Sequence, residues 1–210
     1  MNDFAGRWRL WERRPADFLL FGVTAVELGI LLFLTTRLTV VDWIYICSNL
    51  LVLGIALTRR PAREQDRSIV AGAAVLVSYA YPYAQVVLLR WLPGYEAWPA
   101  GALVLITIGA CLSLASLISL GRFFGVRPAL RGLTTMGPYR VVRHPLYLAY
   151  VLQDVGYNLQ EWSIGTLILV AAGWASMIYR IHAEERVLSH DANWSDYASR
   201  VRYRLLPGIW

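Results

Sequence analysis

Long stretches with almost no charged residues are the feature that most constrains this chain. A helix needs roughly 20 apolar residues to cross a bilayer, and four uncharged or nearly uncharged stretches are long enough. They run from Phe18 to Thr36, from Thr39 to Thr58, from Ile69 to Leu89 and from Ala100 to Leu120. Hydrophobic residues make up 57% of the chain and charged residues 16%, a composition that does not suit a soluble globule. The sequence therefore predicts an integral membrane protein.

Two shorter apolar stretches follow, Pro145 to Asn158 and Ser163 to Tyr179. Only the short segment 159–162 separates them, which favours a helical hairpin. Each stretch is slightly short for an independent span, so we expect the pair to pack against the other helices with a polar inner face. The predicted fold is all-α, with about six hydrophobic helices in a single domain covering 1–210, four of them in 17–120.

The arginines predict the orientation, because short loops rich in positive charge stay in the cytoplasm. They gather before the first predicted helix, between the second and third, between the fourth and fifth, and after the sixth. The opposite loops carry only Arg37 and Arg90, with interfacial aromatic residues beside them. We expect both termini to be cytoplasmic, and the protein to reside in a bacterial inner membrane.

Several function classes are disfavoured. The net charge of +6 lies at helix ends, where anionic lipid headgroups would meet it, so we expect no nucleic-acid partner. Cys47 and Cys111 fall inside predicted spans, which excludes a disulfide framework. His144, His182 and His190 lack the spacing of a metal site, so we expect no metal. No phosphate-binding loop, dinucleotide-binding glycine motif or nucleophile elbow occurs.

Chemistry is more plausible in the two polar segments that bracket the hairpin, 121–144 and 180–210. The first ends in Gly-Pro-Tyr-Arg-Val-Val-Arg-His-Pro-Leu-Tyr, residues 137–147. Pro145 suits the first turn of a helix, where free amides and the helix dipole favour an anion. The alternative is that these Arg and His residues are interfacial anchors.

The second segment begins Arg180-Ile181-His182-Ala183-Glu184-Glu185. Arg180 and Glu184 lie one helical turn apart on one face. A plain helical ion pair is the alternative, although an Arg placed before its Glu is the less favourable order.

Together the two segments resemble the isoprenylcysteine carboxyl methyltransferase family, a group that also contains phospholipid N-methyltransferases. The resemblance rests on G-P-Y-x-x-x-R-H-P-x-Y, a short hairpin, R-x-x-x-E-E-x-x-L and a Tyr-rich basic tail. It implies that 121–210 is a cofactor-binding region with a helical hairpin and a C-terminal lid. It also implies S-adenosyl-L-methionine as cofactor, S-adenosyl-L-homocysteine as product, and a lipophilic acceptor reached from the bilayer.

The resemblance assigns residues as well. The expected cofactor-binding residues are Tyr139, Arg143, His144, Pro145, Leu146, Tyr147 and Glu184, with Leu133 and Thr134 from a less similar strip. Arg180 matches an arginine associated with the acceptor. Glu185 is a candidate general base, as is His182, should the acceptor be an amine; a carboxylate acceptor needs no base.

The acceptor stays open at this point. An isoprenylcysteine-like carboxylate or another lipid acid is the first expectation, and a phospholipid amine or a small thiol the alternative. A non-catalytic membrane scaffold is the alternative of another class. Tyr147, Tyr150, Asp154 and Asn158 recur at helical steps and predict a polar stripe, which either lines a cavity or holds helices together. Glu27, inside the first predicted span, must face protein or water. The sequence does not indicate an oligomeric state.

Overall fold

The computed structural model describes residues 22, 24–26, 28–29, 40–90, 100–160 and 162–210. The chain forms two compact units, Met1–Arg59 and Arg60–Trp210. Most of the first predicted span, Phe18 to Thr36, and Glu27 within it lie outside the described residues.

Helix α3, Val40–Thr58, belongs to the first unit. It matches the second predicted span to within a residue at its start. Its polar side chains bond back into the helix: Ser48 Oγ donates to the carbonyl of Ile44 and Asn49 Nδ2 to that of Tyr45, each at 2.9 Å. The apolar helix therefore needs no outside partner for these groups.

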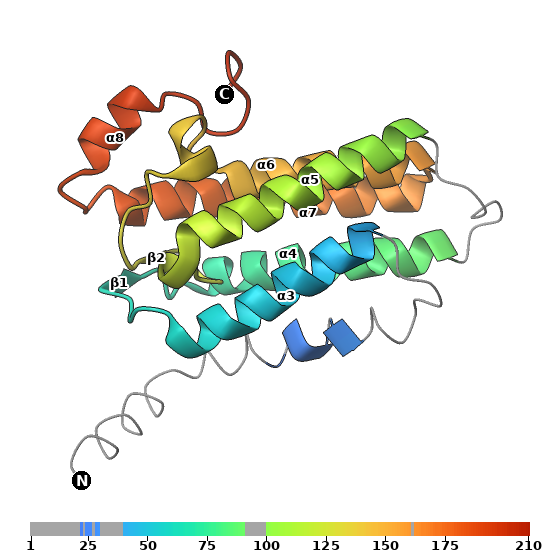
Figure 1. Cartoon of the computed structure of the whole chain (residues 1–210), viewed down its shortest axis with the longest axis horizontal. Helices are drawn as coiled ribbons and strands as arrows, with labels where there is room; N and C mark the ends of the chain where they lie inside the picture. Colours follow the sequence, from blue (N-terminus) through green and yellow to red (C-terminus); the bar gives the residue numbers. More distant parts are fainter. Residues whose placement is uncertain (1–21, 23, 27, 30–39, 91–99, 161) are drawn as a thin grey trace, which may run out of the picture. The chain divides into compact units, whose positions relative to one another are not determined.

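The second unit contains the remaining elements (Figure 1). Its α-helices are α4 (Ile69–Arg90), α5 (Ala100–Leu120), α6 (Pro145–Gln160), α7 (Ile164–Leu188) and α8 (Trp194–Arg200). Two short 3₁₀ helices, η1 (Gly121–Phe123) and η2 (Gly137–Arg140), lie between α5 and α6. The expectation of an all-α fold needs one correction. Strands β1 (Glu64–Gln65) and β2 (Ala129–Leu130) form a two-residue antiparallel ladder, because the loops before α4 and before α6 lie side by side.

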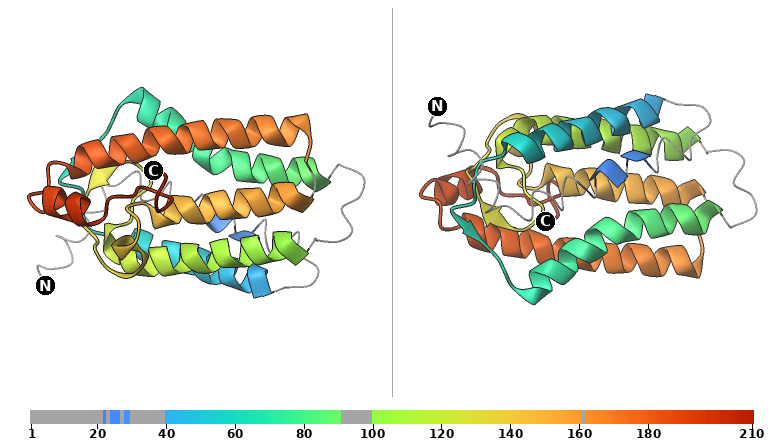
Figure 2. Two further views of the ribbon diagram at one scale, coloured as in Figure 1. Left: turned by 90° about the horizontal axis from the view of Figure 1, so that it is seen from above. Right: turned by 90° about the horizontal axis from the view of Figure 1, so that it is seen from below.

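The four long helices of this unit form two close pairs, α5 with α6 and α4 with α7 (Figure 2). Small residues allow the close approach. A Cβ on Gly109 of α5 would come within 2.8 Å of the Ala149 carbonyl, and one on Gly156 of α6 within 3.0 Å of the Ala102 carbonyl. In the other pair, Ser78 and Ser176 place their hydroxyl oxygens 2.6 Å apart. Small residues are a common means of packing helices in lipid.

The two pairs meet along a wider seam. Helices α6 and α7 approach each other over a much shorter length than the helices within each pair. Long side chains bridge the space instead: Tyr81 Oη of α4 and Trp174 Nε1 of α7 both donate to Asp154 Oδ2 of α6, at 2.9 and 2.8 Å. The predicted polar inner face of α6 is thus present at Asp154.

Within the described residues, two helices are long and apolar enough to cross a bilayer, Ala100–Phe123 and Ile164–Leu188. Helix α7 continues past the apolar stretch through its charged residues to Leu188, as the expected one-turn spacing of Arg180 and Glu184 requires. Its start is fixed by a capping box in which Ser163 and Thr166 bond each other's backbone amides. The count of six hydrophobic helices and the cytoplasmic termini stay predictions.

Candidate active site at the start of helix α6

The segment that leads into α6 turns sharply before the helix begins. Gly137 has a φ of 57°, in the left-handed region that favours glycine, and a Cβ there would collide with Ser119 Oγ of α5. The 3₁₀ turn η2 follows, with Pro138 near its start. Pro145 then occupies the first position of α6, as its missing amide hydrogen allows. This path holds His144 where α6 begins, at one end of the seam between the two helix pairs. We call this end the mouth of the seam.

The C-terminal tail pairs with the residues just before α6. The backbone amides of Arg143 and His144 donate to the carbonyls of Tyr203 and Arg204, both at 2.9 Å. Arg143 Nη2 also donates to the carbonyl of Arg202 at 2.8 Å. Two segments some 60 positions apart in the sequence are therefore held together by both backbone and side chain.

Helix α8 supports this arrangement through a buried hydroxyl. Tyr197 Oη donates to the carbonyl of Tyr139 at 2.9 Å, and both tyrosines are buried. Burial raises the pKa of Tyr197 to about 12 and raises that of Tyr139 as well, because their ionised forms would lose hydration. Both phenols are therefore neutral at physiological pH, and Tyr197 remains a hydrogen-bond donor.

Glu185 joins the tail to α7. Its Oε1 lies 2.8 Å from Arg143 Nη1 and 3.3 Å from His144 Nε2. Its Oε2 accepts from Arg204 Nε at 2.9 Å and lies 2.8 Å from Arg204 Nη2. The fork of Arg204 thus binds one oxygen of this largely buried carboxylate, and the other oxygen faces the α6 start.

Glu184, the neighbouring carboxylate, faces the seam. Tyr147 Oη donates to its Oε1 in a short hydrogen bond. His144 Nδ1 lies 3.7 Å from its Oε2, so the two ring nitrogens of His144 face the two consecutive glutamates. The side chain of Glu184 keeps 23% of its surface exposed, about twice the fraction of Glu185. Glu184 is therefore held in place and still reachable.

Arg180 closes the other side of Glu184. Its Nη2 lies 4.0 Å from Glu184 Oε1 and donates to the carbonyl of Val126 at 3.0 Å. The guanidinium carbon stands 5.3 Å from the centre of the Tyr147 ring, in a cation–π arrangement. Its Nε is buried and has no hydrogen-bond partner within the described part of the chain. A buried cation with a free donor is a feature that a ligand can complete.

The structure brings most of the predicted site residues together. Six of them form one connected cluster: Arg143, His144, Tyr147, Arg180, Glu184 and Glu185. Tyr139, Pro145 and Leu146 flank it in the same segment and are buried. Leu133 and Thr134 lie in the loop after β2, and Thr134 Oγ1 is buried without a hydrogen-bond partner among the described residues. His182, the other candidate base, lies 2.8 Å through its Nδ1 from the Ile178 carbonyl, beside Trp210.

Three contributors were not predicted. Arg204, the carbonyl of Val126 and the backbone of Tyr203 and Arg204 all take part in holding the cluster. A basic tail was visible in the sequence, but nothing in it singled out Arg204. Backbone carbonyls carry no sequence signal at all.

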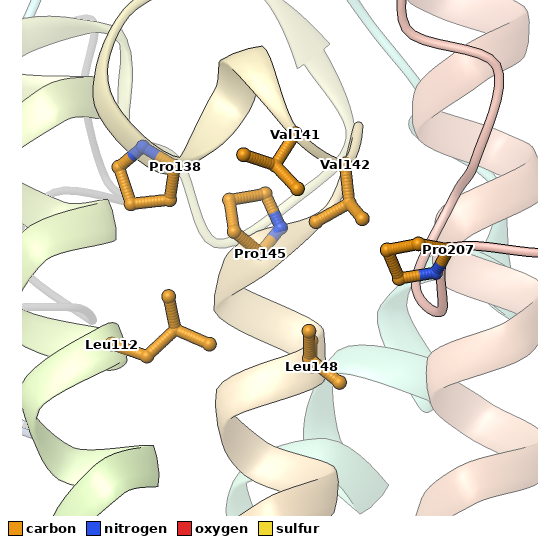
Figure 3. Close-up of a pocket in the computed structure, with 7 residues that line it drawn as sticks. All are labelled: Leu112, Pro138, Val141, Val142, Pro145, Leu148 and Pro207. Atoms are coloured by element: carbon orange, nitrogen blue, oxygen red, sulfur yellow. The ribbon is translucent and has the colours of Figure 1, made fainter.

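An apolar pocket of about 180 Å³ lies beside this cluster (Figure 3). Its walls come from α5, η2 and the residues that follow it, α6 and the tail: Leu112, Pro138, Val141, Val142, Pro145, Leu148 and Pro207. Pro145 and Leu148 share one face of α6, and Tyr147 lies on another. The pocket suits a hydrocarbon group and is smaller than usual for a whole organic ligand. Its lining carries none of the charged side chains described above.

Comparison with known families gives a match to part of the chain. Residues 98–191 match the model of the phospholipid methyltransferase family, a little under half of the chain. The matched region is thus similar to a family of the isoprenylcysteine and phospholipid methyltransferase group. It contains α5, α6 and α7 and every residue of the six-residue cluster. A search of curated proteins finds no significant match to the chain.

The resemblance seen in the sequence is therefore confirmed at the level of this group. A phospholipid methyltransferase family implies a methyltransferase, and the two long apolar helices fit a protein of the membrane. Tail residues 192–210, including Arg204, lie beyond the matched region, so their part in the cluster is a feature of this structure.

Proposed function

We propose that the chain is an S-adenosyl-L-methionine-dependent methyltransferase of the membrane that transfers a methyl group to a lipophilic acceptor. The observation that carries the proposal is the pairing of Glu184 with Tyr147 and His144 at the mouth of the seam. A reachable carboxylate fixed by two neighbours at the start of a different helix exceeds what membrane anchoring requires.

The residues present fit the cofactor. Its ammonium group and ribose hydroxyls are donors, and Glu184 offers a fixed, partly exposed carboxylate that accepts such donors. Its carboxylate and ring nitrogens are acceptors, and the buried Thr134 hydroxyl is a donor without a partner among the described residues. We assign cofactor binding to Glu184, His144 and Tyr147, with Thr134 and the remaining residues of the segment 139–147 around them.

When bound, S-adenosyl-L-methionine supplies a methyl group that is already activated by its sulfonium. The protein then has to bind, orient and exclude water, and needs neither a metal nor a covalent intermediate. The seam suits that task, because the cluster at its mouth consists of buried or half-buried side chains closed on one side by the tail.

We assign the acceptor's anionic group to Arg180. The residue is 93% buried, its guanidinium remains charged, and its Nε is a donor without a partner within the described structure. A carboxylate bound there is itself the nucleophile, as for an isoprenylcysteine-like or other lipid acid. A phosphate bound there places the neighbouring amine of a phospholipid close to the same point. Arg180 thus accommodates both leading acceptor classes, whereas a neutral thiol would bring no anion to its free Nε.

We propose a positioning role for Glu185. Three cationic or protonatable side chains, Arg143, His144 and Arg204, already engage its two oxygens. These neighbours stabilise the charged form of the carboxylate, which makes it a poor proton acceptor. Its effect on catalysis then passes through His144 and the tail.

Calorimetric titration of S-adenosyl-L-methionine and S-adenosyl-L-homocysteine into the purified protein in detergent tests the proposal. We expect both ligands to bind the wild type. Glu184→Gln keeps the size of the side chain and removes its charge, so the affinity should fall by about 10- to 100-fold, the ratio expected for a charge-assisted hydrogen bond.

The matched control is Glu64→Gln, which changes an exposed glutamate paired with His190 at 2.7 Å. It should bind both ligands as the wild type does. A folded wild type that binds neither ligand, in detergent or in nanodiscs, would overturn the proposal and favour the non-catalytic scaffold.

A further inference from the structure

A second polar cluster lies deeper in the seam, away from the cofactor site. It consists of Tyr81 and Gln85 on α4, Asp154 and Asn158 on α6, and Trp174 on α7. Asn158 follows Tyr147 by eleven residues on α6, which places it about 16 Å further along the helix. None of these five residues was assigned a role at the charged cluster.

Around Asp154, the hydrogen-bond donors of this cluster have acceptors. Asp154 Oδ2 accepts from Tyr81 Oη and from Trp174 Nε1. Asn158 Nδ2 donates to the Asp154 carbonyl at 2.8 Å. These bonds join three helices, so this level of the seam is rigidly held.

One helical turn further from the start of α6, two buried polar atoms lack hydrogen-bond partners within the described residues. Gln85 is 2% exposed, and its Nε2 has no hydrogen-bond partner within the described residues. Asn158 Oδ1 is likewise buried and without a partner there. A buried unpaired polar group costs roughly 1–3 kcal/mol. Both atoms therefore call for an explanation.

The two unpaired atoms belong to residues that follow the bonded pair of Tyr81 and Asp154. Gln85 follows Tyr81 by four residues and Asn158 follows Asp154 by four, so each lies about one turn further along its helix, with Pro82 between Tyr81 and Gln85 on α4. Helices α4 and α6 run in the same direction (Figures 1 and 2), so both steps lead to one level of the seam. Gln85 Nε2 is a donor and Asn158 Oδ1 is an acceptor. A hydroxyl group accepts one hydrogen bond and donates another, and so complements both.

We propose that this level of the seam is a binding site for the hydroxyl group of a lipophilic molecule, with Gln85 Nε2 donating to its oxygen and Asn158 Oδ1 accepting its hydrogen. The hydrocarbon part lies along the seam between the two helix pairs. The site is separate from the cofactor cluster and does not depend on the proposed methyl transfer. An enclosed water molecule offers the same hydroxyl chemistry, and the experiment distinguishes the two sources.

Photolabelling tests the site without cofactor. The probes are a long-chain primary alcohol carrying a mid-chain diazirine and the alkane of equal length carrying the same group. Each is added to the full chain in nanodiscs, irradiated, and the labelled residues are mapped by mass spectrometry. The alcohol should label the seam-facing residues of α4, α6 and α7 about fivefold more than the alkane, the ratio expected from one net hydrogen bond.

The variants locate the effect. Gln85→Leu and Asn158→Leu should each bring the alcohol down to the level of the alkane, and Gln85→Met provides a second, flexible replacement should Gln85→Leu fail to fold. Asn49→Leu in α3 is the control, because the amide of Asn49 bonds its own helix; it should leave the ratio unchanged.

Equal labelling of the wild-type seam by both probes would overturn the proposal, and a water molecule would then be the occupant. A preference for the alcohol that survives both Leu variants would overturn it too. Cofactor binding, measured separately by calorimetry, is unaffected by either result, so failure here is distinct from failure of the proposed function.

Discussion

The two polar clusters of the seam are built in opposite ways. The cluster at the start of α6 is mostly charged. Two glutamates and three arginines, with a histidine among them, come from the segment before α6, from α7 and from the tail. The deeper cluster has a single carboxylate, and its bonded neighbours are neutral donors from α4 and α7. The charged cluster forms only when the tail folds back onto the start of α6. The deeper cluster needs only the correct register of helices that are already packed together.

This difference has a physical reason. Full charges are costly in the interior of a membrane protein, so they lie where arginine forks and backbone groups surround them. Neutral hydrogen-bonding groups lose less hydration free energy on burial deeper in the bundle, and the one carboxylate there accepts hydrogen bonds from two donors. Loss of a single residue should therefore destabilise the charged cluster more than the deeper one. In the deeper cluster, the effect should stay with the residues that lose their hydrogen bonds.

Replacing Glu185 by alanine should have the largest effect on the structure. The change leaves Arg143 and Arg204 without their shared counter-ion and releases the tail, at a cost of about 2–4 kcal/mol for breaking a largely buried ion cluster. Hydrogen exchange should show faster exchange of the amides of Arg143 and His144, which donate to the tail.

The control is Asp196→Ala, which removes the exposed pair of Asp196 with Arg200. Exposed pairs contribute little, so exchange in the tail should hardly change. Unchanged protection of the Arg143 and His144 amides in Glu185→Ala would contradict the role given to this carboxylate.

Asp154→Leu should have the next largest effect. It leaves the Tyr81 hydroxyl and the Trp174 indole nitrogen buried without their acceptor, which should lower the free energy of unfolding by about 1–3 kcal/mol. Asp154→Asn keeps an oxygen acceptor and should lose less. Unfolding in detergent with increasing denaturant measures both variants.

The same pair of variants sharpens the contrast between the clusters, because cofactor binding should survive in folded Asp154→Asn. A loss of cofactor affinity in Asp154→Asn as large as that in Glu184→Gln would show that the two clusters act as one site.

Tyr197→Phe should have the smallest effect, a loss of about 1 kcal/mol at neutral pH for one buried hydrogen bond to the Tyr139 carbonyl. The pKa of Tyr197 is raised to about 12 in the folded protein, above its ordinary value near 10. The stability linked to this group is thus complete below pH 10 and is lost as the pH rises towards 12.

Thermal unfolding across that range checks the expectation. The wild type should lose stability more steeply than Tyr197→Phe between pH 10 and 12. Parallel slopes for the two proteins would contradict the burial of the Tyr197 phenol.

The sequence predicted the helices better than the contacts between them. The predicted spans 39–58, 69–89 and 100–120 agree closely with α3, α4 and α5, because apolar length is a strong local signal. The apolar stretch 163–179 marked only the uncharged part of α7, and the helix continues through Arg180 and Glu184, as their expected one-turn spacing requires. The strands β1 and β2 were missed, because two-residue ladders arise from loop proximity and leave no pattern.

The candidate site shows the same division. The spacing of His144, Tyr147, Arg180 and Glu184 indicated the site, because both segments carry distinctive residues. Arg204 and the Val126 carbonyl were missed because their contacts depend on how the tail and the loop after η1 fold back. Gln85 was passed over because a single amide in an apolar stretch resembles any other until its neighbours are known.

Methyl transfer itself tests the central proposal most directly. The purified protein in nanodiscs made from a bacterial lipid extract is incubated with S-adenosyl-L-methionine labelled in its methyl group, and the lipid phase is analysed by mass spectrometry. The account predicts a labelled lipid product that is absent with Glu184→Gln and strongly reduced with Arg180→Gln. A folded wild type that binds the cofactor yet labels no lipid from this extract would contradict the proposed lipophilic acceptor.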